Sequence, residues 1–147
     1  KSFDTLQLLD INNDILTNAS LNLTGNCSQI NNYQHDIFTS SLPQLSKCNS
    51  IGITYVLHCI PGEIENNLDN LIRNIPFKNY NLYGASVITD PKEKNNLAEL
   101  ELFWLNKMGI FNNDSDTYSG LYEFLENSGL EYNLKLKGYV AMFNIKI

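Results

Sequence analysis

The residues best suited to chemistry follow one apolar run, Ser50 to Gly62 (SIGITYVLHCIPG). The run is rich in β-branched residues and stops at His58, Cys59 and a Pro61-Gly62 turn. A buried parallel strand has this composition, and open α/β sheets bind ligands beyond the C-terminal ends of such strands. The ordinary pKa of histidine suits it to acid–base work near neutral pH. The pattern therefore predicts a ligand-binding edge at His58.

The cysteines do not indicate a metal site or a disulfide. Cys27, Cys48 and Cys59 are widely spaced and form neither a CxxC pair nor a Cys/His ligand array. Three reduced thiols are expected, with no disulfide framework and no zinc site. No carboxylate cluster has the spacing of metal ligands, so no metal is expected either.

Hydrophobic periodicity predicts the elements that must position this edge. Strand patterns cover 5–11, 30–37, 51–57 and 80–89, and helical patterns cover 12–23, 63–74, 91–108 and 118–127. Extended segments at 131–136 and 139–145 flank Lys137-Gly138, which predicts a hairpin. The alternation predicts an α/β Rossmann-like three-layer sandwich, in which a mostly parallel sheet carries a C-terminal antiparallel strand pair at one edge.

Two helices and one glycine allow sharper predictions. The first helix is capped by the cluster at 12–14 and should turn its apolar residues inward, namely Ile15, Leu16, Ala19 and Leu23. The helix that follows Asp90-Pro91 has an apolar face of Leu97, Leu100, Phe103 and Trp104, and we expect Phe103 and Trp104 in the core rather than in a substrate platform. Gly84 indicates close approach of another backbone or of a ligand.

Composition limits the partners. A chain of 147 residues with 43% hydrophobic content fits one domain, 1–147. A net charge of −6 without a basic cluster argues against nucleic acid and against an anionic membrane surface. No apolar run approaches the roughly 20 residues of a membrane span, and a signal-peptide pattern is absent. A cytoplasmic protein is expected.

Several blocks together resemble the C-terminal two-thirds of a class I S-adenosylmethionine-dependent methyltransferase. They occur in the family's order: LLDIN at 8–12, HDIF at 35–38, ITYVLHCIPG at 53–62, LYGASVI at 82–88, LNKMGIFNND at 105–114 and GYVAMFNIKI at 138–147. The central and last two blocks resemble one small-molecule subgroup. The resemblance implies transfer of a methyl group from S-adenosylmethionine to a small-molecule acceptor, mainly by aligning the two in line.

The chain departs from this family at its beginning. Class I enzymes open with a strand and a glycine-rich turn that approaches the methionine part of the cofactor, and this sequence has no such element before Asp10. The missing strand is central in the family's sheet, so its neighbours would be left with open edges. We expect an N-terminally incomplete fragment of a longer enzyme, or a chain that needs a partner or upstream segment to complete the sheet.

The resemblance also implies roles for individual residues. Asp10, with Ile11 beside it, would accept hydrogen bonds from the ribose hydroxyls, and capping of the following helix is its structural alternative. Asp36 would accept from the adenine amine while Ile37 packs on the ring, unless Asp36 merely forms a turn.

At the strand end, His58 would lie near the methyl donor as the candidate catalytic residue, and a histidine bonded to the backbone is the alternative. Tyr55 and Gly62 would form the wall and turn of the pocket. Cys59 should be a small buried group, because direct methyl displacement needs no covalent enzyme intermediate. Asn106, Lys107 and Gly109 match family positions without an assigned role.

Two other functions stay open at this point. One is a non-catalytic α/β module, either a degenerate remnant or a subunit whose partner supplies the first strand. The other is a nicotinamide-dependent Rossmann oxidoreductase, which also uses an acid after its second strand. The terminal hairpin and the HCIPG turn favour the methyltransferase over the oxidoreductase.

Overall fold

The computed structural model describes residues 3–37, 48–76, 78–91 and 95–147. The chain divides into two compact units, residues 1–46 with 74–76 and residues 47–73 with 77–147. Each unit has its own sheet, and each is described by itself. That the whole chain makes one domain stays a prediction, and most of the loop expected before Asn49 lies outside the described residues.

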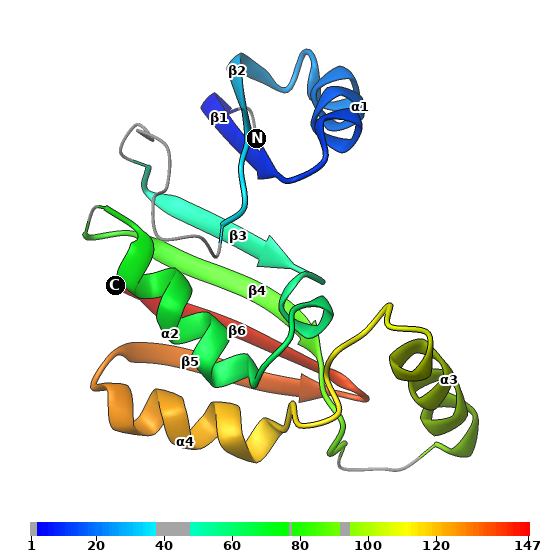
Figure 1. Ribbon diagram of the computed structural model, residues 1–147. Coiled ribbons are helices and arrows are strands. Elements are labelled where there is room, and N and C mark those ends of the chain that lie inside the picture. Colours follow the sequence, from blue (N-terminus) through cyan, green and yellow to red (C-terminus); the bar gives the residue numbers. More distant parts are fainter. Residues whose placement is uncertain (1–2, 38–47, 77, 92–94) are drawn as a thin grey trace. The chain divides into compact units, whose positions relative to one another are not determined.

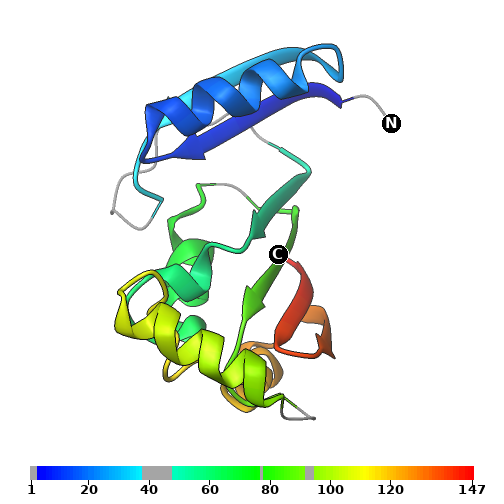
Figure 2. The ribbon, with the colours of Figure 1, turned by 90° about the vertical axis from the view of Figure 1, so that its right-hand side faces the viewer.

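The first unit is a strand–helix–strand motif. It contains β1 (Phe3–Asp10), α1 (Asn13–Leu23) and β2 (Cys27–Gln34). The two strands pair in parallel, with Asp10 opposite Gln34, and α1 runs along them (Figure 2). The Asn12 side chain accepts the Asp14 N–H at 2.9 Å, which confirms the predicted cap. The predicted second strand is present but begins three residues earlier, at Cys27.

The inward face of α1 is narrower than its apolar residues suggest. Leu16 is buried and Ala19 and Leu23 are half-buried, but Ile15 is 53% exposed. The prediction for Ile15 is wrong because neighbouring helical residues point about 100° apart. Because α1 packs on only two strands, the side chain of Leu16 is covered and that of its neighbour Ile15 is left in solvent.

The second unit is built on a four-stranded sheet. Its order is β3 (Ser50–Thr54), β4 (Asn81–Val87), β6 (Val140–Lys146) and β5 (Glu131–Lys137). The terminal hairpin pairs antiparallel and lies at one edge of this sheet, as predicted. Only β3 and β4 pair in parallel here, because β6 is antiparallel to both of its neighbours. The fold is α/β, but this sheet is mixed rather than mostly parallel.

Two helices cover one face of this sheet and make its core. In Figure 1, α2 (Ile64–Asn74) lies in front of the strands and α4 (Tyr118–Ser128) runs along β5, below it in this view. Gly129, at φ 69°, ends α4 as predicted. The helices contribute buried Ile64, Leu68, Leu71, Leu121 and Leu125, and the strands contribute Ile53, Leu82, Ala141, Phe143 and Ile145. None of the helices in the described ranges combines the length and apolarity that a membrane crossing requires.

Gly84 allows β4 to approach its neighbours closely. A Cβ atom at this position would lie 2.1 Å from the Ile53 carbonyl oxygen and 2.6 Å from the Phe143 ring. No side chain fits at such distances. The expected close approach of another backbone is confirmed, and that backbone is β3.

Helix α3 (Asn96–Lys107) differs most from expectation. It is capped by Asn95, whose side chain accepts two backbone N–H groups, and so begins five residues after Pro91. Its apolar face is exposed, with Phe103 57% and Trp104 49% accessible, and Leu97 and Leu100 still more exposed than Trp104. The prediction that Phe103 and Trp104 belong to the core is wrong. Periodicity identifies an apolar face but says nothing about what covers it.

Candidate functional site

The edge at the end of β3 is a turn rather than a continued strand. β3 ends at Thr54, three residues earlier than predicted. Tyr55 follows with φ 58° and donates its N–H to the Ala85 carbonyl at 2.8 Å. A short 3-10 turn, η1 (Leu57–Cys59), then carries the polar groups. This tight turn brings the side chain of His58 next to Ser86 and Val87 at the end of β4.

His58 is buried, with 2% of its surface exposed. Its Nδ1 accepts the Val87 N–H at 3.4 Å and lies 3.4 Å from Ser86 Oγ. Burial lowers the pKa of this imidazole, so it is neutral at pH 7. The histidine is thus held by backbone and side chain within its own unit. Its action on a methyl acceptor stays a prediction.

Cys59, next to it, is exposed, so its predicted burial is wrong. The turn points this side chain outward, and Sγ lies 4.0 Å from the Tyr55 carbonyl oxygen. Partial desolvation raises the pKa of the thiol, which lowers its thiolate fraction. This supports the view that Cys59 is not a nucleophile. Cys27 and Cys48 are free as well.

The loop after α3 closes over the turn. The Phe111 ring meets the His58 ring edge-on, with centroids 4.4 Å apart. The Asn112 N–H donates to the His58 carbonyl at 2.8 Å, and its side-chain Nδ2 donates to the Cys59 carbonyl at 2.9 Å. Two blocks that are about 50 residues apart in the chain therefore form one surface.

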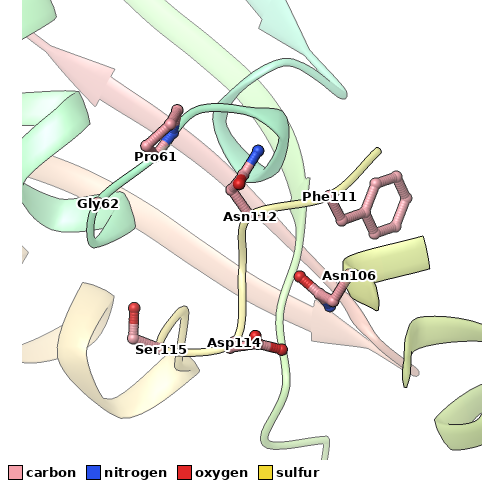
Figure 3. Close-up of a pocket in the computed structure, with 7 residues that line it drawn as sticks. All are labelled: Pro61, Gly62, Asn106, Phe111, Asn112, Asp114 and Ser115. Atoms are coloured by element: carbon pink, nitrogen blue, oxygen red, sulfur yellow. The ribbon is translucent and has the colours of Figure 1, made fainter. Parts of the chain in front are cut away.

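That surface borders an open cavity of about 390 Å³ (Figure 3). Its lining residues come from the Pro-Gly turn and from the segment that follows α3: Pro61, Gly62, Asn106, Phe111, Asn112, Asp114 and Ser115. The predicted turn residue Gly62 is among them, and Tyr55 is not. Sequence reasoning did not assign Phe111, Asn112, Asp114 or Ser115, although most of them lie in the NKMGIFNND block that had already stood out.

A buried acid lies close to this cavity. The Asp116 side chain is fully buried, and its Oδ1 accepts the Ile64 N–H at 2.9 Å at the start of α2. Its Oδ2 has no hydrogen-bond partner among the described residues. Burial raises the pKa of Asp116 from 3.8 to about 7, helped by Glu65 and Glu63 and opposed by the Ile64 N–H.

The remaining predicted site residues belong to the first unit. Asp10 is the last residue of β1, and one of its oxygens, Oδ1, accepts the Asn12 N–H at 2.8 Å. Ile11 beside it is 68% exposed. Asp36 is exposed and Ile37 half-buried, just beyond the end of β2. Because β1 and β2 are parallel, these four residues share one end of their strand pair.

The structure thus brings the predicted residues together in two groups. Asp10, Ile11, Asp36 and Ile37 form one group, and Tyr55 and His58 form the other, each within its own unit. Every one of them follows, or ends, a strand that pairs in parallel. The predicted position at strand ends is confirmed, and the binding roles stay predictions.

Two known proteins are similar to this chain in sequence. No protein-family model matches the chain. It is 30% identical to the uncharacterized protein YbcY of Escherichia coli (strain K12) over 143 residues, 95% of this chain and 73% of YbcY. It is 26% identical to demethylluteothin O-methyltransferase of Streptomyces thioluteus over 103 residues, 65% of this chain and 42% of that enzyme.

A solved structure extends the likeness. Mitomycin 7-O-methyltransferase MmcR superposes with a TM-score of 0.61 at 20% identity, over 95% of this chain and 41% of MmcR. The shared feature at that identity is the fold. The chain spans less than half the length of each of these two methyltransferases.

Proposed function

The chain belongs to the family of YbcY and has the fold of S-adenosylmethionine-dependent methyltransferases, and we propose that it takes part in methyl transfer from S-adenosylmethionine to a small molecule. The observation that carries the proposal is the position of Asp10 and Asp36 at one end of a parallel strand pair. Ligands of open α/β folds bind at that end. The likeness to an O-methyltransferase at 26% identity supports the same chemistry.

The residues present fit the nucleoside part of this cofactor. Asp10 uses Oδ1 to hold the following turn, which orients its carboxylate, and a carboxylate can accept further hydrogen bonds from ribose hydroxyls. The exposed Ile11 and half-buried Ile37 offer apolar surface for the flat base. Asp36 would accept from the exocyclic amine. The cofactor supplies an activated methyl group, and the chain's residues supply orientation.

In the second unit, the turn at the end of β3 would orient the acceptor. His58 is neutral, and because its Nδ1 accepts the Val87 N–H, its proton is on Nε2, so it would orient the acceptor by donating a hydrogen bond from Nε2. Tyr55, half-exposed at the strand end, would form part of the wall on the cofactor side. Methyl transfer then depends on alignment of donor and acceptor.

One observation also favours the second candidate, a module that needs a further strand. The strands form two separate sheets, and in the described residues β1 and β3 are edge strands that pair on one side only, as are β2 and β5. We propose that the edges of β1 and β3 accept an additional parallel strand, from a preceding segment of a longer Rossmann-like enzyme or from a partner chain. Without it, the chain would lack the glycine-rich turn that holds the methionine part of the cofactor.

Calorimetric titration with S-adenosylhomocysteine tests both proposals. We expect weak or no binding to the 147-residue chain, and binding to a chain extended by a strand and a glycine-rich turn. Submicromolar binding to the 147-residue chain would overturn the need for a further strand. Absence of binding to the folded extended chain would overturn the cofactor assignment.

A carboxylate variant makes the titration specific. In the extended chain, Asp10→Asn should weaken binding by roughly 10- to 100-fold, because hydrogen bonds to a charged group contribute about 1.5–3 kcal/mol. Asp14→Asn, on the exposed first turn of α1, is the matched control and should leave the affinity within about twofold. Equal affinities of the two variants would remove Asp10 from the site.

A further inference from the structure

Two buried or half-buried asparagines connect the blocks that form the cavity. We propose that Asn106 and Asn113 are positioning residues, which hold Phe111 and Asn112 against the turn and set the hydrogen-bonding state of His58. The proposal deepens the methyl-transfer function and rests on it for its biological meaning. It gives Asn106 the role that the sequence alone left open.

The first step is a reciprocal pair between the two amides. Asn106 Nδ2 donates to Asn113 Oδ1 at 2.8 Å, and the Asn113 backbone N–H donates to Asn106 Oδ1 at 3.1 Å. Asn106 Nδ2 also donates to the Leu102 carbonyl at 3.1 Å, one turn back in α3. The last turn of α3 is thereby tied to the loop that follows it.

The second step ties the loop to the sheet. Asn113 is fully buried, and its Nδ2 donates to the Val87 carbonyl at 3.1 Å. The N–H of the same Val87 donates to His58 Nδ1 at 3.4 Å. One residue at the end of β4 therefore links the amide pair to the histidine.

Between these anchors lie the two residues that touch the turn. Phe111 packs on the His58 ring, and Asn112 bonds to the carbonyls of His58 and Cys59. The segment between Asn106 and Asn113 is fixed at both ends, so these two residues have little freedom to leave their contacts. Buried amides that lose a partner pay the full cost of desolvation, so partial loosening is disfavoured.

The histidine reports on this arrangement through its tautomer. A Nδ1 atom that accepts the Val87 N–H carries no proton, so the proton of the neutral ring is on Nε2. If the amide pair positions Val87, its loss should weaken this preference. A role confined to general stability would leave the tautomer of the folded protein unchanged.

The test is long-range ¹H–¹⁵N NMR of the histidine rings in the 147-residue chain. The chain has two histidines, and His35 in the other unit serves as an internal reference. We expect the wild-type His58 ring to be predominantly the Nε2–H form at pH 7. Asn113→Leu removes the donor to Val87 without placing a titratable group in the core, and should reduce the ratio of the Nε2–H to the Nδ1–H tautomer by roughly fivefold or more.

Asn106→Leu should have the same effect by removing the other half of the pair. Asn96→Leu, at an exposed position on the first turn of α3, is the matched control and should leave the ratio unchanged. If either leucine variant fails to fold, Asn106→Ala, at the half-buried partner, decides the test.

An unchanged His58 tautomer in the folded Asn113→Leu protein, or in a folded Asn106 variant, would overturn the proposal. The titratable side chain that meets the ring from its own segment is Tyr55, with ring centroids 6.1 Å apart, and it is not altered in these variants. The measurement needs no cofactor. Its failure is therefore distinct from failure of S-adenosylhomocysteine binding, which would overturn the methyl-transfer proposal.

Discussion

Asp116 shows how a single buried group can make the stability of this protein depend on pH. Its carboxyl is fully buried, its pKa is raised to about 7, and Oδ2 has no hydrogen-bond partner in the described part of the chain. A raised carboxyl pKa contributes stability below the unfolded value near 3.8, and this contribution is lost as pH rises through about 7. Wild-type protein therefore carries an uncompensated buried charge at alkaline pH.

Asp116→Asn should remove this cost. The amide oxygen can still accept the Ile64 N–H, and no charge remains to be buried. We expect the melting temperature of the variant relative to wild type to be higher at pH 8.5 than at pH 5, measured by circular dichroism. Asp114→Asn, at an exposed neighbouring carboxylate, is the control. If the difference in melting temperature between Asp116→Asn and wild type is the same at pH 5 and pH 8.5, the raised pKa of Asp116 would be contradicted.

At the scale of elements, two glycines in adjacent strands provide a matched pair. Gly84→Ala places a methyl group 2.1 Å from the Ile53 carbonyl oxygen, so β3 and β4 must separate. The free energy of unfolding should fall by about 3 kcal/mol or more. In Gly52→Ala the added methyl group meets only the Tyr83 side chain, at 3.1 Å, and the free energy of unfolding should change by less than about 1 kcal/mol. Equal effects in urea denaturation would show that the close approach at Gly84 is not tight.

The apolar face of helix α3 is exposed, so truncation of its side chains should lower the free energy of unfolding only slightly. Because Trp104 is half-exposed and also covered by Lys107 Nζ at 5.1 Å from its ring, Trp104→Ala should cost less than about 1 kcal/mol. Leu125→Ala in the buried face of α4 should cost about 2–5 kcal/mol. A comparably large loss for Trp104 in the 147-residue chain would mean that α3 packs in the core after all.

At the scale of the whole molecule, the edge strands of the two sheets predict where amide hydrogens exchange quickly. β1 and β3 each have one unpaired side within the described residues. Amide hydrogens on those sides should exchange quickly in the 147-residue chain and become protected in a chain extended by the proposed parallel strand. Hydrogen-exchange mass spectrometry of segments 3–10 and 50–54 measures this. Unchanged exchange in both segments would contradict insertion of a strand.

Much of the fold could be predicted from periodicity and turn chemistry. The cap at Asn12, the end of α4 at Gly129 and the terminal hairpin agree with the structure because each depends on local backbone preferences. The candidate edge at the end of β3 was also found locally, from an apolar run that stops at polar residues. The wrong predictions for Ile15, Cys59 and the apolar face of α3 concern which side of an element is covered. The predicted mostly parallel sheet was wrong because strand pairing joins segments that are distant in the chain.

The sequence by itself determined the type and order of the elements and the residues at the strand ends, since these follow from local conformational preference and hydrophobic pattern. Only the tertiary structure decided that β6 lies between β4 and β5, that His58 turns inward while Cys59 faces solvent, and that Asn106 meets Asn113. Those outcomes depend on contacts between distant segments, where burial and hydrogen-bond satisfaction select one arrangement from many that the local pattern allows.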